Sequence, residues 1–107
     1  MRKILIIEDN EDVREYTADL LELSHYTVQT SADGTSGIEK AKHFSPDLII
    51  CDIMMPGIDG YQVLEALQGD SKTAGIPFIF LSAKADKTDI RKVMNLGADD
   101  YLTKPFE

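Results

Sequence analysis

The chain contains a single cysteine, no tryptophan and few basic residues. One cysteine excludes an internal disulfide and any paired-cysteine metal or redox motif. Cys51 ends the apolar run DLIIC, which predicts a buried structural thiol. Eleven Lys and Arg residues against nineteen Asp and Glu give a formal net charge of −8. Nucleic acids and anionic membranes are bound through clustered Lys and Arg, so neither is expected as a direct partner.

Long apolar runs are absent as well. No stretch approaches the roughly 20 residues of a membrane-spanning helix. The four apolar residues after Lys3 are too few for the apolar region of a signal peptide. We therefore expect a cytoplasmic protein. A length of 107 residues predicts one domain, extending over residues 1–107.

Four short apolar segments each end at a chemically reactive or charged residue. The segments alternate with stretches of helical periodicity, which predicts an α/β fold with a mostly parallel sheet. The strand ends that lead into helices lie along one edge of such a sheet, where ligands bind. We therefore expect carboxylates, a hydroxyl and an ammonium group to converge there. These residues are Glu8, Asp9, Asp52, Ser82 and Lys104.

The pattern predicts five strands and four intervening helices. The strands are expected at about 3–7, 26–30, 48–51, 76–81 and 99–102. The second strand is the more polar one, which is typical of a sheet edge. Asn10 and Asp59 are expected to cap the first and third helices, and Asp33 precedes the second. The fourth helix is expected to begin at Asp86 or Thr88.

The acidic residues suggest a metal site. Carboxylates and a backbone carbonyl at a strand-end cleft form an oxygen-rich site that suits Mg²⁺. Glu8 and Asp9 alone could equally be an acidic cluster at a helix N-terminus. Ser82 and Lys104 have ordinary alternatives too, as a capping hydroxyl and as a surface lysine before a turn.

Several motifs together resemble the receiver domain of bacterial response regulators, the CheY-like family. They are Glu8-Asp9, the stretch from Asp52 through Met55-Pro56-Gly57 to Asp59-Gly60, the pair Ser82-Ala83, and Lys104-Pro105-Phe106. The match covers essentially the whole chain in the right order and spacing. It implies a flavodoxin-like, doubly wound, five-stranded parallel sheet of order 2-1-3-4-5 in a three-layer sandwich.

The resemblance also implies a function in two-component signal transduction. Asp52 would accept a phosphoryl group from a phosphohistidine on a histidine kinase or phosphotransfer protein. Asp9, Asp52 and the main-chain carbonyl of Met54 would bind Mg²⁺, with Glu8 acting through a water. Such a domain is a signalling switch that catalyses its own phosphotransfer and dephosphorylation, rather than a separate enzyme.

Three more roles follow from the resemblance. Lys104 would hold a phosphate oxygen, and Ser82 would donate a hydrogen bond to another. Movement of Ser82 would let Tyr101 turn inward, so these two residues would form the switch. The chain departs from the family at Phe106-Glu107, where the fifth helix should begin. We therefore expect a domain truncated before that helix, with self-association through the uncovered sheet face as one consequence.

Two other functions fit parts of the pattern. A Mg²⁺-dependent aspartyl-phosphate phosphatase would use the same carboxylates, but it needs a second acid beside the nucleophile, and Ile53 and Met54 occupy those positions. A flavodoxin-type flavin domain would need a phosphate loop after the first strand. The acidic run from Glu8 to Asp12 would repel a phosphate there.

Overall fold

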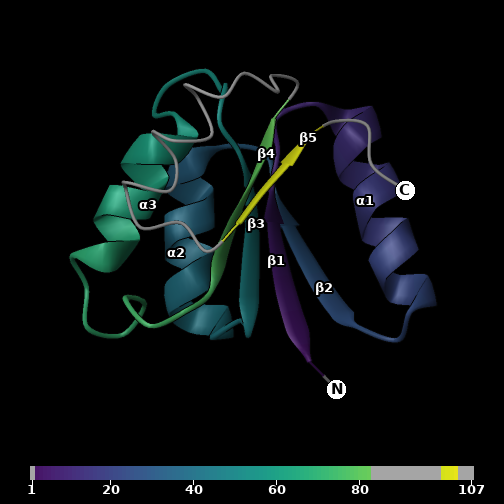
Figure 1. Ribbon diagram of the computed structural model, residues 1–107, viewed down its shortest axis with the longest axis horizontal. Helices are drawn as coiled ribbons and strands as arrows, with labels where there is room; N and C mark the ends of the chain where they lie inside the picture. Colours follow the sequence, from purple (N-terminus) through teal and green to yellow (C-terminus); the bar gives the residue numbers. More distant parts are fainter. Residues whose placement is uncertain (1, 83–99, 104–107) are drawn as a thin grey trace.

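The structure, a computed structural model, describes residues 2–82 and 100–103 (Figure 1). Five parallel strands form one sheet in the order β2-β1-β3-β4-β5. The predicted strand number, direction and order are confirmed. The strands are β1 (Lys3–Ile7), β2 (Thr27–Ser31), β3 (Leu48–Asp52), β4 (Phe78–Ser82) and β5 (Asp100–Thr103).

Helices cover both faces of the sheet. Figure 1 shows α1 (Glu11–Leu23) on one side, with α2 (Gly34–Phe44) and α3 (Gly60–Gln68) on the other. Alternate residues of the strands point to each helix layer, which is why the central strands are apolar throughout. Ile4, Ile6, Ile50 and Leu81 pack with α1, whereas a larger cluster packs with α2 and α3. That larger cluster includes Leu5, Ile7, Ile49, Cys51 and Phe80.

The two predicted N-caps, Asn10 and Asp59, are confirmed, and Asp33 caps the second helix. The side chain of Asn10 accepts from the Val13 N–H at 3.0 Å, and that of Asp33 from the Ser36 N–H at 2.7 Å. Asp59 forms a reciprocal pair of hydrogen bonds with Gln62, each 2.9 Å long. Each cap satisfies an N–H group left free by the first helical turn. The helices therefore begin at fixed residues behind the strand ends.

Two strands begin later than the apolar pattern predicts. The Tyr26 N–H donates to the Leu21 carbonyl at 3.2 Å, so Tyr26 belongs to the exit from α1. The Ile76 N–H donates to the Thr73 carbonyl at 3.1 Å, which places Ile76 in a turn before β4. The helix expected from Asp86 or Thr88 lies outside the described residues.

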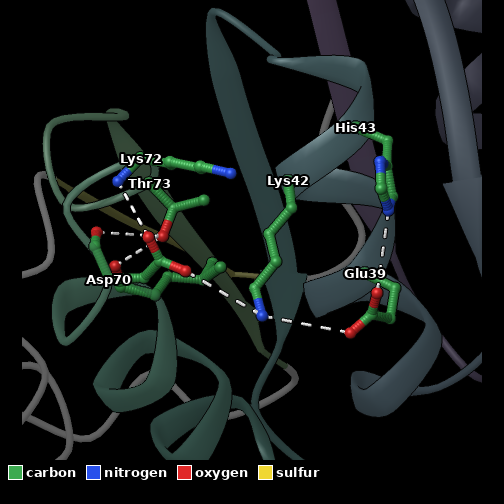
Figure 2. A network of polar contacts seen from close by, with 7 residues as sticks. Glu39, Lys42, His43, Asp70, Lys72 and Thr73 are labelled. Carbon is green, nitrogen blue, oxygen red and sulfur yellow. Dashed lines mark hydrogen bonds and ion pairs between the residues drawn. The ribbon is translucent and has the colours of Figure 1, made fainter.

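A polar network ties α2 to the turn that follows α3 (Figure 2). Lys42 Nζ lies 3.9 Å from both Glu39 Oε1 and Asp70 Oδ2. These pairs are partly exposed, so each contributes little to stability. The Thr73 hydroxyl is buried and donates to the Leu67 carbonyl at 2.6 Å. This buried bond fixes the turn that leads into β4.

Among the described residues, no helix is long and apolar enough to cross a membrane.

Candidate metal and phosphoryl site

Three carboxylates from two neighbouring strands meet at one edge of the sheet. Ile7 of β1 pairs with Cys51 of β3, so Glu8 and Asp52 continue side by side. Carboxylate oxygens of Glu8, Asp9 and Asp52 all lie within 4.8 Å of one another. Glu8 is 0 % and Asp52 5 % exposed, while Asp9 is open to solvent. The predicted convergence of these acids is confirmed.

The loop after β1 is held by Arg14, a residue for which the sequence pattern predicts no role. Arg14 Nη1 donates to the main-chain carbonyls of Glu8 at 2.9 Å and Asp9 at 3.4 Å. Glu8 Oε2 also accepts from the Asn10 N–H at 3.2 Å. The N-terminal end of a helix disfavours a cation. The position of Arg14, near the start of α1, could therefore have indicated that its guanidinium binds groups outside the helix.

Gly60 belongs to the motif that follows Asp52, but the sequence did not predict its structural role. Its N–H donates to the Ile53 carbonyl at 2.8 Å, which seats the start of α3 against the end of β3. A Cβ atom on Gly60 would lie only 2.4 Å from the main-chain oxygen of Asp52. The absence of a side chain therefore allows α3 to approach the backbone that carries Asp52.

The donor set fits a hard divalent cation. All three side chains offer carboxylate oxygens, which Mg²⁺ prefers over nitrogen or sulfur. Two of them are withdrawn from water, so their negative charge is poorly screened and a cation would neutralise it. Glu8, Asp9 and Asp52 can therefore hold Mg²⁺ together with water. The side chain of Met54 is 64 % exposed, and the role of its carbonyl stays a prediction.

The remaining predicted site residues are only partly covered by the structure. Ser82 is the last residue of β4, and the pairing of Asp52 with Leu81 brings its backbone beside the end of β3. Tyr101 lies on β5, paired with Phe80. The side chains of Ser82 and Tyr101, and all of Lys104, lie outside the described part of the chain, so their predicted roles are untested.

Cys51 is buried directly before Asp52, as predicted. It is 0 % exposed, and its Sγ donates to the Asp52 carbonyl at 3.2 Å. Burial raises the pKa of the Cys51 thiol well above its usual value, and the negative charges of Asp52, Glu8 and Asp59 raise the pKa further. The thiol is therefore a neutral core group and not a nucleophile.

This burial predicts a loss of stability at alkaline pH. An exposed thiol ionises near 9.0, so above that pH the unfolded chain releases a proton that the native chain keeps. The stabilising contribution is complete below 9.0, and the free energy of unfolding should then fall by about 1.4 kcal/mol per pH unit. Urea unfolding from about pH 8 to about pH 10 measures this slope. Cys51→Ala should be less stable overall but should show a flatter decline; an unchanged decline would contradict the assignment.

Comparison with known proteins agrees with the site and the fold. The family described as "Response regulator receiver domain" matches residues 4–107. The chain is 41% identical over its full length to the DNA-binding dual master transcriptional regulator RpaA of Synechocystis, covering 44% of that protein. It is also 41% identical, over 96% of its length, to hybrid signal transduction histidine kinase D of Dictyostelium discoideum, covering 7% of that protein.

Solved structures give the same answer. The chemotaxis protein CheY4 of Vibrio cholerae superposes with a TM-score of 0.94 at 29% sequence identity, over 100% of this chain and 89% of that one. The chain spans less than half the length of the two curated relatives named above. Motifs, strand order, acidic cluster and family match therefore agree: the chain belongs to the response regulator receiver domain family.

Proposed function

We propose that Asp52 accepts a phosphoryl group from a phosphohistidine of a histidine kinase or phosphotransfer protein, in a Mg²⁺-dependent reaction. Receiver domains are signalling switches of two-component systems. The observation that carries the proposal is the buried Asp52 carboxylate, within 4.8 Å of two further carboxylates at the end of the parallel sheet.

Phosphorylation of Asp52 and its later hydrolysis are two separate displacement steps at phosphorus. An Asp52 oxygen attacks phosphorus, the phosphorus–nitrogen bond to the imidazole breaks, and the imidazole leaves with the bonding electrons and takes up a proton. A water molecule later attacks the same phosphorus and breaks its bond to Asp52, which releases inorganic phosphate and a proton. A bound Mg²⁺ supplies positive charge that offsets repulsion between the carboxylates and the phosphoryl oxygens.

The residues around Asp52 contribute orientation. The Cys51 thiol donates a hydrogen bond to the Asp52 carbonyl, and Gly60 packs against the same backbone. The main chain that carries Asp52 is therefore held on two sides. Arg14 fixes the loop that bears Glu8 and Asp9. Phosphate contacts by Lys104 and Ser82, and switching through Ser82 and Tyr101, belong to this proposal. So do a cytoplasmic location and self-association through the sheet face that a fifth helix would cover.

The test is intact-mass spectrometry after incubation with Mg²⁺ and acetyl phosphate. Wild-type chain should gain one phosphoryl group, and the gain should require Mg²⁺. Asp52→Asn should gain none, because an amide is a poor nucleophile. Asp47→Asn is the matched control, since Asp47 precedes β3 at the opposite end of the strand, where its Oδ2 accepts a hydrogen bond from the Lys3 N–H at 2.8 Å. It should be phosphorylated like the wild type.

A phosphoryl adduct that persists in Asp52→Asn would overturn the assignment of the acceptor. If the wild type shows no adduct, binding of beryllofluoride, a stable mimic of the phosphoryl group, distinguishes two explanations. Mg²⁺-dependent beryllofluoride binding that Asp52→Asn loses would indicate a short-lived phosphate. Its absence would contradict the proposed function.

A further inference from the structure

The outer edge of β2 offers main-chain groups for pairing. Thr27 donates its N–H to Arg2 at 2.9 Å, and Ser31 accepts from the Glu8 N–H at 3.0 Å, so these residues face β1. The direction of main-chain groups alternates along a strand. The N–H and C=O groups of Val28 and Thr30 therefore point away from β1. No described strand pairs with that edge.

One of the outward carbonyls is already covered. Lys40 of α2 donates its ammonium group to the Thr30 carbonyl. A lysine that blunts an edge strand is a common defence against unwanted pairing. Within residues 2–82 and 100–103, no comparable side-chain contact covers the outward N–H groups of Val28 and Thr30 or the carbonyl of Val28. They are the groups with which an added strand pairs.

On the α1 face of β2 lies an acidic groove of about 540 Å³. Glu15, Asp19 and Glu22 line it at helical spacing, one turn apart along α1. Val28 and Thr30 of β2 also line it. Arg14 lies at one end, but its guanidinium is bound to the Glu8 and Asp9 carbonyls. The groove therefore presents a row of negative charge beside an open strand edge.

On the α2 face, a second groove of about 500 Å³ flanks the same strand. Lys3, Lys40 and His43 line it, with Gln29 of β2. Glu39 also lies there, 3.8 Å from His43 and 3.9 Å from Lys42 (Figure 2). The two grooves therefore differ in charge, acidic on the α1 side and mainly basic on the α2 side.

A strand added to this edge would send alternate side chains into the two grooves. We propose that the outer edge of β2 docks an extended peptide segment with Lys or Arg at every second position. Its basic side chains lie in the acidic groove, while its main chain pairs with Val28 and Thr30. A second copy of this chain fits less well, because each copy carries a net charge of −8. The proposal is independent of phosphorylation at Asp52.

The test uses a fluorescein-labelled short peptide that alternates lysine and threonine, with a glutamate and threonine peptide as its control. Fluorescence anisotropy should detect binding of the lysine peptide and not of the glutamate peptide. Asp19→Lys with Glu22→Lys should weaken binding about tenfold or more, since two ion pairs become repulsions. Both residues are exposed, so the fold should be retained. Glu65→Lys, exposed on α3, should bind within about twofold of wild type.

Amide hydrogen exchange separates strand addition from loose charge attraction. The lysine peptide should slow exchange at Val28 and Thr30 of the wild type, and Thr30→Pro should lose both the protection at Val28 and the affinity. Proline there removes an outward N–H and leaves the ladder with β1 intact. Binding that is insensitive to the groove charges, or that leaves these amides unprotected, would overturn the proposal. Without peptide, the protection of these amides could rise with protein concentration while light scattering detects dimers. That result would mean that the edge binds a second copy of this chain instead.

Discussion

Gly60→Ala should lower the free energy of unfolding by about 3 kcal/mol, a large part of the stability of a domain this size. The added Cβ would lie 2.4 Å from the Asp52 main-chain oxygen, 2.9 Å from Ile53 Cα and 3.0 Å from Phe80 Cε1. Two of these atoms are backbone, which cannot turn aside as a flexible side chain does. Urea unfolding at neutral pH measures the loss.

Gly75 supplies the matched control. A Cβ at Gly75 would meet nothing within 4 Å, so Gly75→Ala should change stability by less than about 0.5 kcal/mol. Any folded Gly60→Ala protein should also be phosphorylated more slowly, because the clash displaces the backbone of Asp52. A Gly60→Ala variant as stable as Gly75→Ala would contradict the close approach of α3 to β3.

The second large effect concerns the crowded acids. Two like charges 4.8 Å apart repel by roughly 3 kcal/mol at an effective dielectric constant of about 20. Asp52→Asn removes the charge of one buried member. It should raise the free energy of unfolding of the metal-free chain by about 1–3 kcal/mol. Thermal or urea unfolding in the presence of a chelator measures this gain.

Mg²⁺ should make the wild type more stable than Asp52→Asn, the reverse of the order expected without metal. At a Mg²⁺ concentration 1,000 times its Kd, the wild type should gain about 4.1 kcal/mol of stability, more than the advantage of the metal-free variant. Asp52→Asn should gain far less, because one carboxylate ligand is gone. Glu65→Gln, which removes an exposed charge on α3, controls for general charge effects and should respond to Mg²⁺ like the wild type. Equal Mg²⁺ stabilisation of wild type and Asp52→Asn would rule out the carboxylate cluster as the metal site.

The acidic site could be predicted from the sequence because the apolar runs identify the strands and the acidic residues directly follow them. The continuous apolar runs before Glu8 and Asp52 mark strands buried on both faces. Once those strands are parallel neighbours, the residues that follow them must meet at one edge. The N-caps were equally accessible, since Asn10 and Asp59 act through their own local backbone.

Other features were hidden because they depend on tertiary contacts. Ile76 is as apolar as the residues of β4, yet it lies in a turn fixed by the buried Thr73. Apolar character alone does not separate a buried turn from a strand. Gly60 resembles an ordinary helix-start glycine until the backbone of Asp52 is placed beside it. Likewise, the partners of Arg14 are two carbonyls whose direction only the folded loop determines.

The strand order has a consequence for how the chain can fold as a ribosome releases it. β2 pairs with β1, β3 joins the other side of β1, β4 joins β3, and β5 joins β4. Every new strand therefore meets a partner that has already emerged, and none must wait for a later segment. Vectorial synthesis can extend the sheet outward from its first strand. The cluster of Glu8, Asp9 and Asp52 can then form once α3 has emerged, while β4 and β5 are still being made.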